Sequence, residues 1–189
     1  MTEFKKQHIQ IIPTLSRLSP IIISIIVCSY AFIIQSLYST YLVICFFIMF
    51  GSNYILKFIG KSFLGSLGER PSGANSCGII FDGIKSISYG MPSGHSQIAW
   101  AVASYLIVKI LIDDVMIDKT DKSDIQNINN TYKIIKSLLF ILILFIIASY
   151  ISYSRVIIEG CHTWMQVIIG GCIGAIMGIS VFVIEKYIF

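Results

Sequence analysis

Charged residues are scarce in this sequence, and long stretches contain none. Asp, Glu, Lys and Arg make up 13% of the 189 residues, whereas soluble domains carry about 25%. So few charged residues cannot cover the surface of a soluble helical bundle, which excludes an ordinary soluble domain. The basic residues are dispersed and the formal net charge is only +4, so the sequence predicts no nucleic-acid-binding surface.

Several familiar motifs are missing as well. The five cysteines have neither zinc-site nor redox-motif spacing. No GxxxxGK[ST] phosphate loop, internal repeat or metal-ligand cluster occurs, so we expect no metal and no cofactor. The first apolar run begins after Arg17, and no small-residue cleavage pattern follows it. We therefore interpret this run as a retained span and not as a cleaved leader.

The uncharged stretches have the lengths of membrane spans. They comprise residues 18–56, 86–108, 137–154 and 160–184. A spanning helix needs about 20 mostly apolar residues, so the last three stretches fit one span each. The first fits two, with a polar break at 35–40. We predict an all-α, polytopic membrane helical bundle with five transmembrane helices, at roughly 18–35, 40–60, 92–112, 134–153 and 163–186.

The chain, residues 1–189, is predicted to form a single integral-membrane domain. Residues 113–130 are polar and rich in turn formers, and we expect them to form a mobile loop. With five spans, the second ends, the third begins, the fourth ends and the fifth begins at one membrane face. The unusual polar residues all fall at this face: Lys61, Arg70, Ser93, Gly94, His95, Arg155 and His162.

These residue types together indicate a phosphate site. Lysine and arginine supply positive charge and forked donors that suit phosphate. Pro92 is tolerated in the first turn of a helix, where Ser93 and Gly94 would present backbone N–H groups to an anion. Two histidines at helix starts could supply a nucleophile and an acid. Taken singly, a basic residue at a span end is usually an interfacial anchor, and Lys57 fits that interpretation.

The same residues resemble the three-part signature of the type 2 phosphatidic acid phosphatase superfamily. Its parts are Lys61…Arg70-Pro71, Pro92-Ser93-Gly94-His95 and Ser154-Arg155…His162. The resemblance covers about residues 54–171. The segments 90–97 and 162–167 resemble the dolichyl diphosphate phosphatase branch. The resemblance to the superfamily implies a four-helix core and a metal-independent enzyme that removes phosphate from lipid phosphates or diphosphates.

The resemblance also implies roles for individual residues. His162 would be the nucleophile that forms a phosphohistidine, and His95 the general acid. Lys61, Arg70, Ser93, Gly94 and Arg155 would bind the phosphoryl oxygens. The spacing from lysine to arginine departs from the family pattern, so Lys57 is the alternative lysine. Gln166 stands where the general pattern has aspartate, and would orient His162 through its carbonyl.

We therefore expect hydrolysis of a polyprenyl diphosphate to the monophosphate and inorganic phosphate. The alternatives are a phosphatidate or sphingoid-phosphate phosphatase, a lipid phosphotransferase, and a catalytically silent protein that binds lipid headgroups. The expected partners are the lipid substrate and the bilayer. For a eukaryotic source, the resemblance suggests the endoplasmic reticulum membrane and N-glycosylation. The basic residues divide almost equally between the two faces, so they do not predict an orientation.

Overall fold

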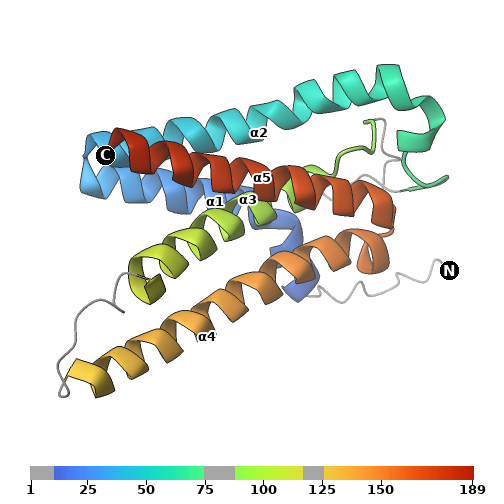
Figure 1. The fold of residues 1–189 in the computed structure, drawn as a ribbon. Coiled ribbons are helices and arrows are strands. Elements are labelled where there is room, and N and C mark those ends of the chain that lie inside the picture. Colours follow the sequence, from blue (N-terminus) through green and yellow to red (C-terminus); the bar gives the residue numbers. More distant parts are fainter. Residues whose placement is uncertain (1–10, 75–87, 117–125) are drawn as a thin grey trace, which may run out of the picture.

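The computed structural model describes residues 11–74, 88–116 and 126–189, and this part of the chain is helical with short connections. The long helices are α1 (Ile11–Ile34), α2 (Leu37–Leu64), α3 (Gly94–Ile110), α4 (Gln126–Tyr153) and α5 (Trp164–Ile188), as Figure 1 shows. Five described helices are long and apolar enough to cross a membrane. The prediction of an all-α bundle with five transmembrane helices is confirmed.

The break between the first two spans lies at Gln35 and Ser36. Gln35 has a positive φ of 49°, which turns the chain out of α1. Ser36 then caps α2, because its hydroxyl accepts the backbone N–H of Ser39 and the Ser39 hydroxyl accepts that of Ser36. The polar residues predicted to separate the spans therefore do so as a helix cap.

Several predicted boundaries differ from the structure, since α1 begins before residue 18, α2 extends beyond 40–60 at both ends and α4 begins before residue 134. The third span was expected to start at Pro92, but α3 starts at Gly94 with Ser93 as its N-cap. The predicted loop 113–130 is shorter at both ends, because a π-helical segment continues to Met116 and α4 already begins at Gln126. Polar composition alone does not end a helix once its end projects beyond the membrane, where side chains and water can solvate it. Residues 117–125 lie outside the described part.

Helix α3 is the centre of the bundle and packs closely against α5. Three glycines, four residues apart on α5, face its backbone. A Cβ would lie 2.6 Å from the Ser93 carbonyl oxygen at Gly170, and 2.0 Å from that of Gln97 at Gly174. At Gly178 it would lie 2.1 Å from the carbonyl oxygen of Ala101. Small residues at this spacing let two membrane helices approach backbone to backbone.

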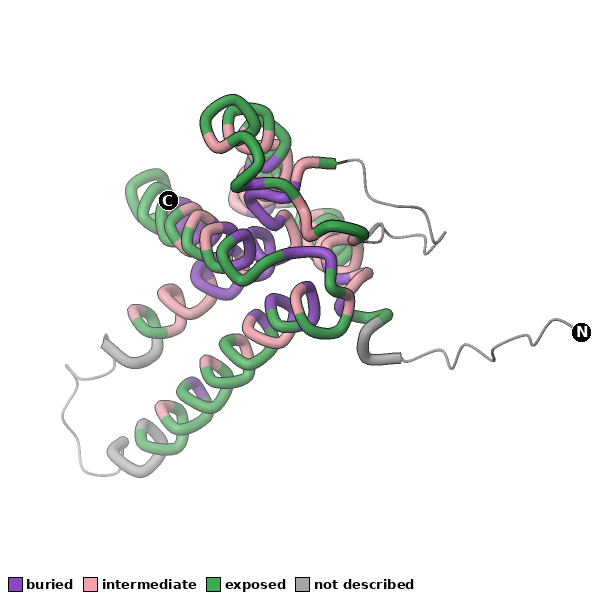
Figure 2. The backbone as a smooth tube through the Cα atoms, turned by 90° about the vertical axis from the view of Figure 1, so that its right-hand side faces the viewer, coloured by how far each residue is buried: buried purple, intermediate pink, exposed green. Residues whose placement is uncertain are grey.

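The outside of the bundle is apolar. Figure 2 shows buried residues where the helices meet and exposed residues on the outward faces. Among the outward side chains, Phe32 is 79% exposed, Phe58 77% and Phe63 84%. Large aromatic side chains left outside in this number fit a lipid-facing surface.

A buried polar network joins the helices at the end where α5 finishes. The Tyr105 hydroxyl donates to Glu185 and lies 2.6 Å from the Tyr38 hydroxyl. Lys109 completes the network through an ion pair with Glu185. This network ties α3 to α5 at the end of the bundle opposite the predicted site residues.

The opposite end of the bundle collects the starts of α1, α3 and α5 and the ends of α2 and α4 (Figure 1). A short 3-10 helix, Gly65–Gly68, follows α2, and a π-helical turn, Ser154–Ile158, follows α4. The topology predicted from the sequence therefore brings the segments with unusual polar residues to one end.

Candidate active site

Gln166 fixes the orientation of His162. The His162 Nδ1–H donates to Gln166 Oε1 across 2.9 Å, while Gln166 Nε2 donates to the carbonyl oxygens of Gly68 at 3.3 Å and Glu69 at 2.6 Å. Those two carbonyls accept only, so they fix which end of the amide faces the imidazole. With its proton on Nδ1, His162 keeps a lone pair on Nε2.

The start of α5 holds both residues in place. Thr163 is the N-cap, and its hydroxyl accepts the backbone N–H of Gln166 at 3.4 Å. In return Gln166 Oε1 accepts the backbone N–H of Thr163 at 3.3 Å. This reciprocal capping box seats Gln166 in the first turn, one turn after the imidazole that it contacts.

Arg70 lies beside the free nitrogen of His162. Its Nη1 is 3.4 Å from His162 Nε2 and donates to the Cys161 carbonyl at 3.0 Å. The other two guanidinium nitrogens are held by Ser88, through the backbone carbonyl at 3.0 Å and the hydroxyl at 2.9 Å. The guanidinium is thus held beside Nε2, where it could donate to a phosphoryl group bound to that nitrogen.

The environment keeps His162 neutral. Burial first, and then the positive charge of Arg70, lower the pKa of His162 from 6.5 to about 3. The hydrogen bond that His162 donates to Gln166 acts in the opposite direction, and the charges of Lys57 and Arg155 add to the lowering. Burial lowers the pKa of Arg70 as well. A neutral imidazole with a lone pair on Nε2 is the form of histidine that attacks an electrophile.

The residues before α3 are arranged differently from the prediction. We expected the backbone N–H groups of Ser93 and Gly94 to face an anion, but the Ser93 N–H donates to the Gln166 carbonyl at 3.1 Å. This bond links α3 to α5 and takes that donor out of the site. The Ser93 hydroxyl is buried, and in the described part of the chain it has no hydrogen-bond partner. It is therefore the hydroxyl, and not the backbone, through which Ser93 could bind phosphate.

Close packing surrounds the segment before α3. A Cβ at Gly94 would lie 3.0 Å from Asn53 Oδ1, and one at Gly90 would lie 2.6 Å from Gln166 Nε2. Asn53, from the middle of α2, donates to the Pro92 carbonyl at 3.3 Å. These contacts leave no room for a side chain at either glycine, so α2 and α5 can press against this segment from two sides.

His95 is bound to the first helix. Its Nε2 donates to the carbonyl oxygen of Arg17 across 3.0 Å, which keeps the proton on that nitrogen and fixes the ring. The positive charges of Arg155, Lys57 and Arg70 act on His95 as well as on His162. The two predicted histidines therefore share one cationic environment.

Arg155 is fully buried and is joined to a carboxylate that the sequence analysis did not single out. Its Nη2 pairs with Oε1 of Glu159, and Oε2 of Glu159 accepts from Nε of Arg17 at 3.2 Å. Glu159 thus bridges two arginines, one of them on α1. The sequence could have indicated Glu159, because it lies four residues after Arg155, one helical turn away. Its second partner, Arg17 on α1, could be identified only from the structure.

Of the two candidate lysines, Lys57 faces the histidines and Lys61 does not. Lys57 is half-buried and lies one helical turn after Asn53, so both face the start of α3. Its charge acts on both histidines. Lys61 is exposed on α2. Lys57 lies four residues before Lys61 on α2. The last turns of α2 and the 3-10 helix that follows lead the chain back to Arg70, so the earlier lysine can face the site.

The described side chains whose charges act on the two histidines, Lys57, Arg70 and Arg155, are basic. In the part of the chain that the structure describes, no three His, Cys, Asp or Glu side chains are grouped as metal ligands. Two arginines and one lysine around two histidines form a site suited to a phosphoryl group.

Comparisons with known proteins agree with this geometry. Residues 40–189 match the family model of the PAP2 superfamily. The chain is 27% identical to dolichyldiphosphatase 1 of Mus musculus over 138 residues, which are 73% of this chain and 49% of that protein. It is 26% identical to dolichyldiphosphatase 1 of Homo sapiens over 136 residues, 72% of this chain and 48% of that protein. The chain thus spans about half the length of these curated relatives.

No solved structure matches the chain significantly. The family match extends from near the start of α2 to the last residue and includes Lys57, Arg70, His95, Arg155 and His162. The chain therefore belongs to the PAP2 superfamily.

Proposed function

We propose that this protein is a membrane phosphatase that hydrolyses a polyprenyl diphosphate of the dolichyl type to the monophosphate and inorganic phosphate. The observation that carries the proposal is the lone pair of His162 Nε2, which lies 3.4 Å from Arg70 Nη1 while Nδ1 is held by Gln166. The dolichyldiphosphatases that the chain resembles support the choice of substrate.

The proposed reaction has two steps. In the first, His162 Nε2 attacks the terminal phosphorus, the bond from phosphorus to the bridging oxygen breaks, and the leaving lipid monophosphate takes a proton from Nδ1 of the His95 imidazolium, whose Nε2–H stays on the Arg17 carbonyl. In the second, water attacks the phosphohistidine, His95 takes the proton of that water, and the P–N bond breaks to release phosphate. Lys57, Arg70 and Arg155 would stabilise the negative charge in both steps, so the reaction would need no metal.

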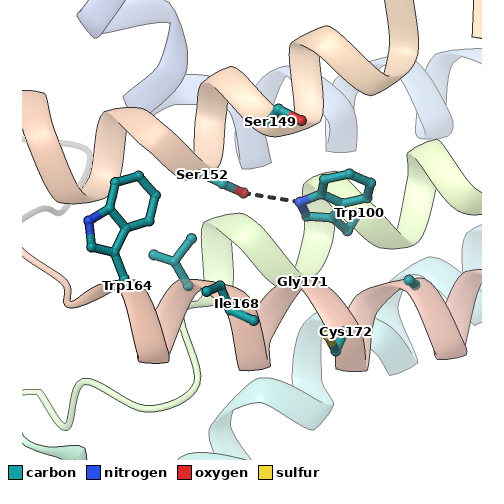
Figure 3. A pocket seen from close by; sticks show the side chains of 9 residues that line it. Trp100, Ser149, Ser152, Trp164, Ile168, Gly171 and Cys172 are labelled. Atoms are coloured by element: carbon teal, nitrogen blue, oxygen red, sulfur yellow. Dashed lines mark hydrogen bonds between the residues drawn. The ribbon is translucent and has the colours of Figure 1, made fainter. Parts of the chain in front are cut away.

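A groove beside the site supports a substrate with an apolar chain. A cavity of about 390 Å³ lies between α4 and α5 with α3 as its floor (Figure 3). Trp100 forms part of the floor and donates to the Ser152 hydroxyl at 3.1 Å. The groove is lined by Trp100, Ser149, Ser152, Trp164, Val167, Ile168, Gly171, Cys172 and Ala175.

The groove is continuous with the helices that carry the site. Trp100 lies five residues after His95 on α3, and Val167 lies five residues after His162. We infer that the chain of a lipid diphosphate would lie in this groove while its terminal phosphate meets His162, before the first step releases it. In a eukaryotic cell, this reaction would recycle the polyprenyl carrier of N-glycosylation at the endoplasmic reticulum membrane.

Phosphate release from purified protein tests the proposal. We expect faster release from a polyprenyl diphosphate than from phosphatidate or a sphingoid phosphate, and activity that survives excess EDTA. His162→Ala should abolish turnover and the acid-labile phosphoenzyme trapped with labelled substrate. Ser180→Ala, at an exposed position on α5 outside the groove, is the matched control and should keep both.

Three other outcomes would each indicate a different function, and a fourth would overturn the proposed nucleophile. Preference for phosphatidate or a sphingoid phosphate would replace the proposed substrate. Transfer of the labelled phosphoryl group to an alcohol in place of water would identify a phosphotransferase. Binding of lipid without release of phosphate would identify a silent headgroup-binding protein. Phosphoenzyme retained in His162→Ala would overturn the proposed nucleophile.

A further inference from the structure

The first helix contacts the candidate active site through Arg17. Its backbone carbonyl accepts from His95 Nε2 at 3.0 Å, and its side-chain Nε donates to Glu159 at 3.2 Å. Both contacts cross from α1 to distant parts of the chain. One residue of α1 therefore contacts the proposed general acid and the acidic partner of Arg155.

These charges lie in a largely enclosed place. The side chain of Arg155 is 0% exposed, that of Glu159 2% and that of Arg17 18%. Water therefore screens the interactions among them weakly, and removal of one partner leaves a buried charge without compensation. The charge balance of the three groups should strongly affect any anion bound at Arg155.

The three groups together carry one positive charge. If only Arg155 and Glu159 were present, the carboxylate would cancel the arginine, and a phosphate would meet a neutral pair. Arg17 supplies the second positive charge, so that Glu159 is shared between two guanidinium groups. Arg155 is thereby oriented by the carboxylate without losing its attraction for an anion.

The contribution of α1 does not follow from the family match. That match begins at residue 40, whereas α1 ends at Ile34. The residue that balances Glu159 thus belongs to a helix outside the matched region.

We propose that Arg17 is a positioning residue of the phosphate site, which balances Glu159 so that Arg155 remains an anion-binding group. The inference rests on the proposed function in that it takes phosphate as the ligand of Arg155. It predicts that the charge of residue 17 controls phosphate affinity even though Arg17 acts through Glu159.

The test measures the affinity for inorganic phosphate by calorimetry on the purified, detergent-solubilised protein. Arg17→Ala should weaken phosphate binding roughly 10–100-fold, as is typical when a group that supports a binding residue is lost. The double variant Arg17→Ala with Glu159→Gln removes the negative charge as well, and should bind phosphate more tightly than Arg17→Ala alone. Arg17→Lys keeps the charge and should bind nearly as the wild type does.

A purely structural role of Arg17 predicts a different pattern. In that case Arg17→Ala would lower thermal stability without changing phosphate affinity, or the double variant would show no recovery, and either result would overturn the proposal. Lys109→Ala is the matched control, since it removes an ion pair between α3 and α5 at the other end of the bundle. It should lower stability and leave phosphate affinity unchanged. Arg17→Gln replaces Arg17→Ala if that variant does not fold.

The measurement also separates this inference from the proposed function. Phosphate binding needs no turnover. A protein whose phosphate affinity depends on Arg17 but which releases no phosphate from lipid diphosphates would contradict the proposed function alone. A protein that releases phosphate at the same rate and binds it with the same affinity after Arg17→Ala would contradict the role of Arg17 alone.

Discussion

Gln166 uses both ends of its amide, which gives a physical reason for glutamine at this position. The carbonyl accepts from His162, and the amino group donates to Gly68 and Glu69, the two residues that precede Arg70. A carboxylate could make the first contact but would repel the two carbonyls. The amide therefore aligns His162 and the segment that carries Arg70 with each other.

Substitution of Gln166 should separate these two contacts. Gln166→Glu keeps an acceptor for His162 but places negative charge against the Gly68 and Glu69 carbonyls, and Gln166→Ala removes both contacts. We expect kcat to fall by roughly 10–100-fold in each. In Gln166→Glu the new carboxylate should raise the pKa of His162 above about 3, so the acid limb of the pH–rate profile should move to higher pH.

The pH profile makes this prediction specific. Gln166→Ala removes a hydrogen bond that raises the pKa of His162, so its acid limb should not move to higher pH. Identical profiles and full activity in both variants would show that Gln166 only packs at the start of α5. Thermal unfolding of each variant controls for loss of the fold.

The two candidate lysines give a matched pair of substitutions on one helix. Lys57→Ala should raise the KM for lipid diphosphate and weaken binding of inorganic phosphate, because its charge acts on both histidines. Lys61→Ala removes an exposed charge and should leave both quantities near the wild-type values. The reverse ranking of the two variants in phosphate titrations would restore Lys61 as the site lysine.

Residue types and spacing predicted a site with His95, His162, Arg70 and Arg155, and the structure brings the segments that carry them to one end of the bundle (Figure 1). Residue types and spacing were not sufficient to predict Lys57, because which lysine of α2 faces inward depends on the rotation of that helix against α3. Arg17 and Glu159 were also missed. Their contact joins residues 142 positions apart, and no local pattern encodes it.

At the scale of elements, α5 positions the site by its close packing on α3. The glycines Gly170, Gly174 and Gly178 allow this contact, and the first of them faces the Ser93 carbonyl at the start of α3. Any displacement of α5 would therefore also displace the turn that carries His162 and Gln166. The packing of these three glycines against α3 therefore sets the distance between α3, which carries His95, and the start of α5, which His162 precedes.

An added methyl group tests this packing. A Cβ at Gly174 would lie 2.0 Å from the Gln97 carbonyl oxygen, so Gly174→Ala should push the helices apart and destabilise the protein by about 1–3 kcal/mol. Gly51→Ala is the matched control on α2, because a Cβ there would have nothing within 4 Å. It should leave the melting temperature unchanged or slightly raised. Equal melting temperatures for the two variants would refute the close approach of α3 and α5.

The spans could be predicted from the charge-free stretches alone, and the helix ends could not. The predicted break before α2 was correct because polar residues there can cap a helix, as Ser36 does. The predicted loop 113–130 was longer than the structure allows because α4 begins at Gln126. The polar residues there continue the helix beyond its apolar part. Hydropathy measures the membrane-embedded length of a helix and does not register where its hydrogen bonding stops.

At the scale of the whole molecule, the charged site and the apolar groove have different surroundings. The site lies at one end of the bundle, whereas the groove runs between α4 and α5 and is bordered by exposed side chains such as Ile168 and Cys172. The groove therefore opens on the side of the bundle, where lipid would surround it. A long-chain substrate would contact both regions at once.

Filling the groove should discriminate between substrates by chain length. Cys172→Trp places a large side chain in the groove, and the loss of contact with two methylene groups, at about 0.8 kcal/mol each, corresponds to about tenfold in KM for a polyprenyl diphosphate. A short, water-soluble aryl phosphate should be hydrolysed as before. Cys28→Trp, at an exposed position on α1, is the control and should affect neither substrate. An equal rise in KM for both substrates would show that the groove does not hold the chain.

The sideways opening between α4 and α5 has a consequence for the direction of the reaction. In the proposed reaction one product is soluble in lipid and the other in water. The monophosphate could leave by lateral diffusion within the bilayer, while inorganic phosphate would leave from the end of the bundle. Two products that part into different phases seldom meet again at the same site. The architecture would thus favour net hydrolysis through dilution of each product in its own compartment, without any stronger binding of the substrate.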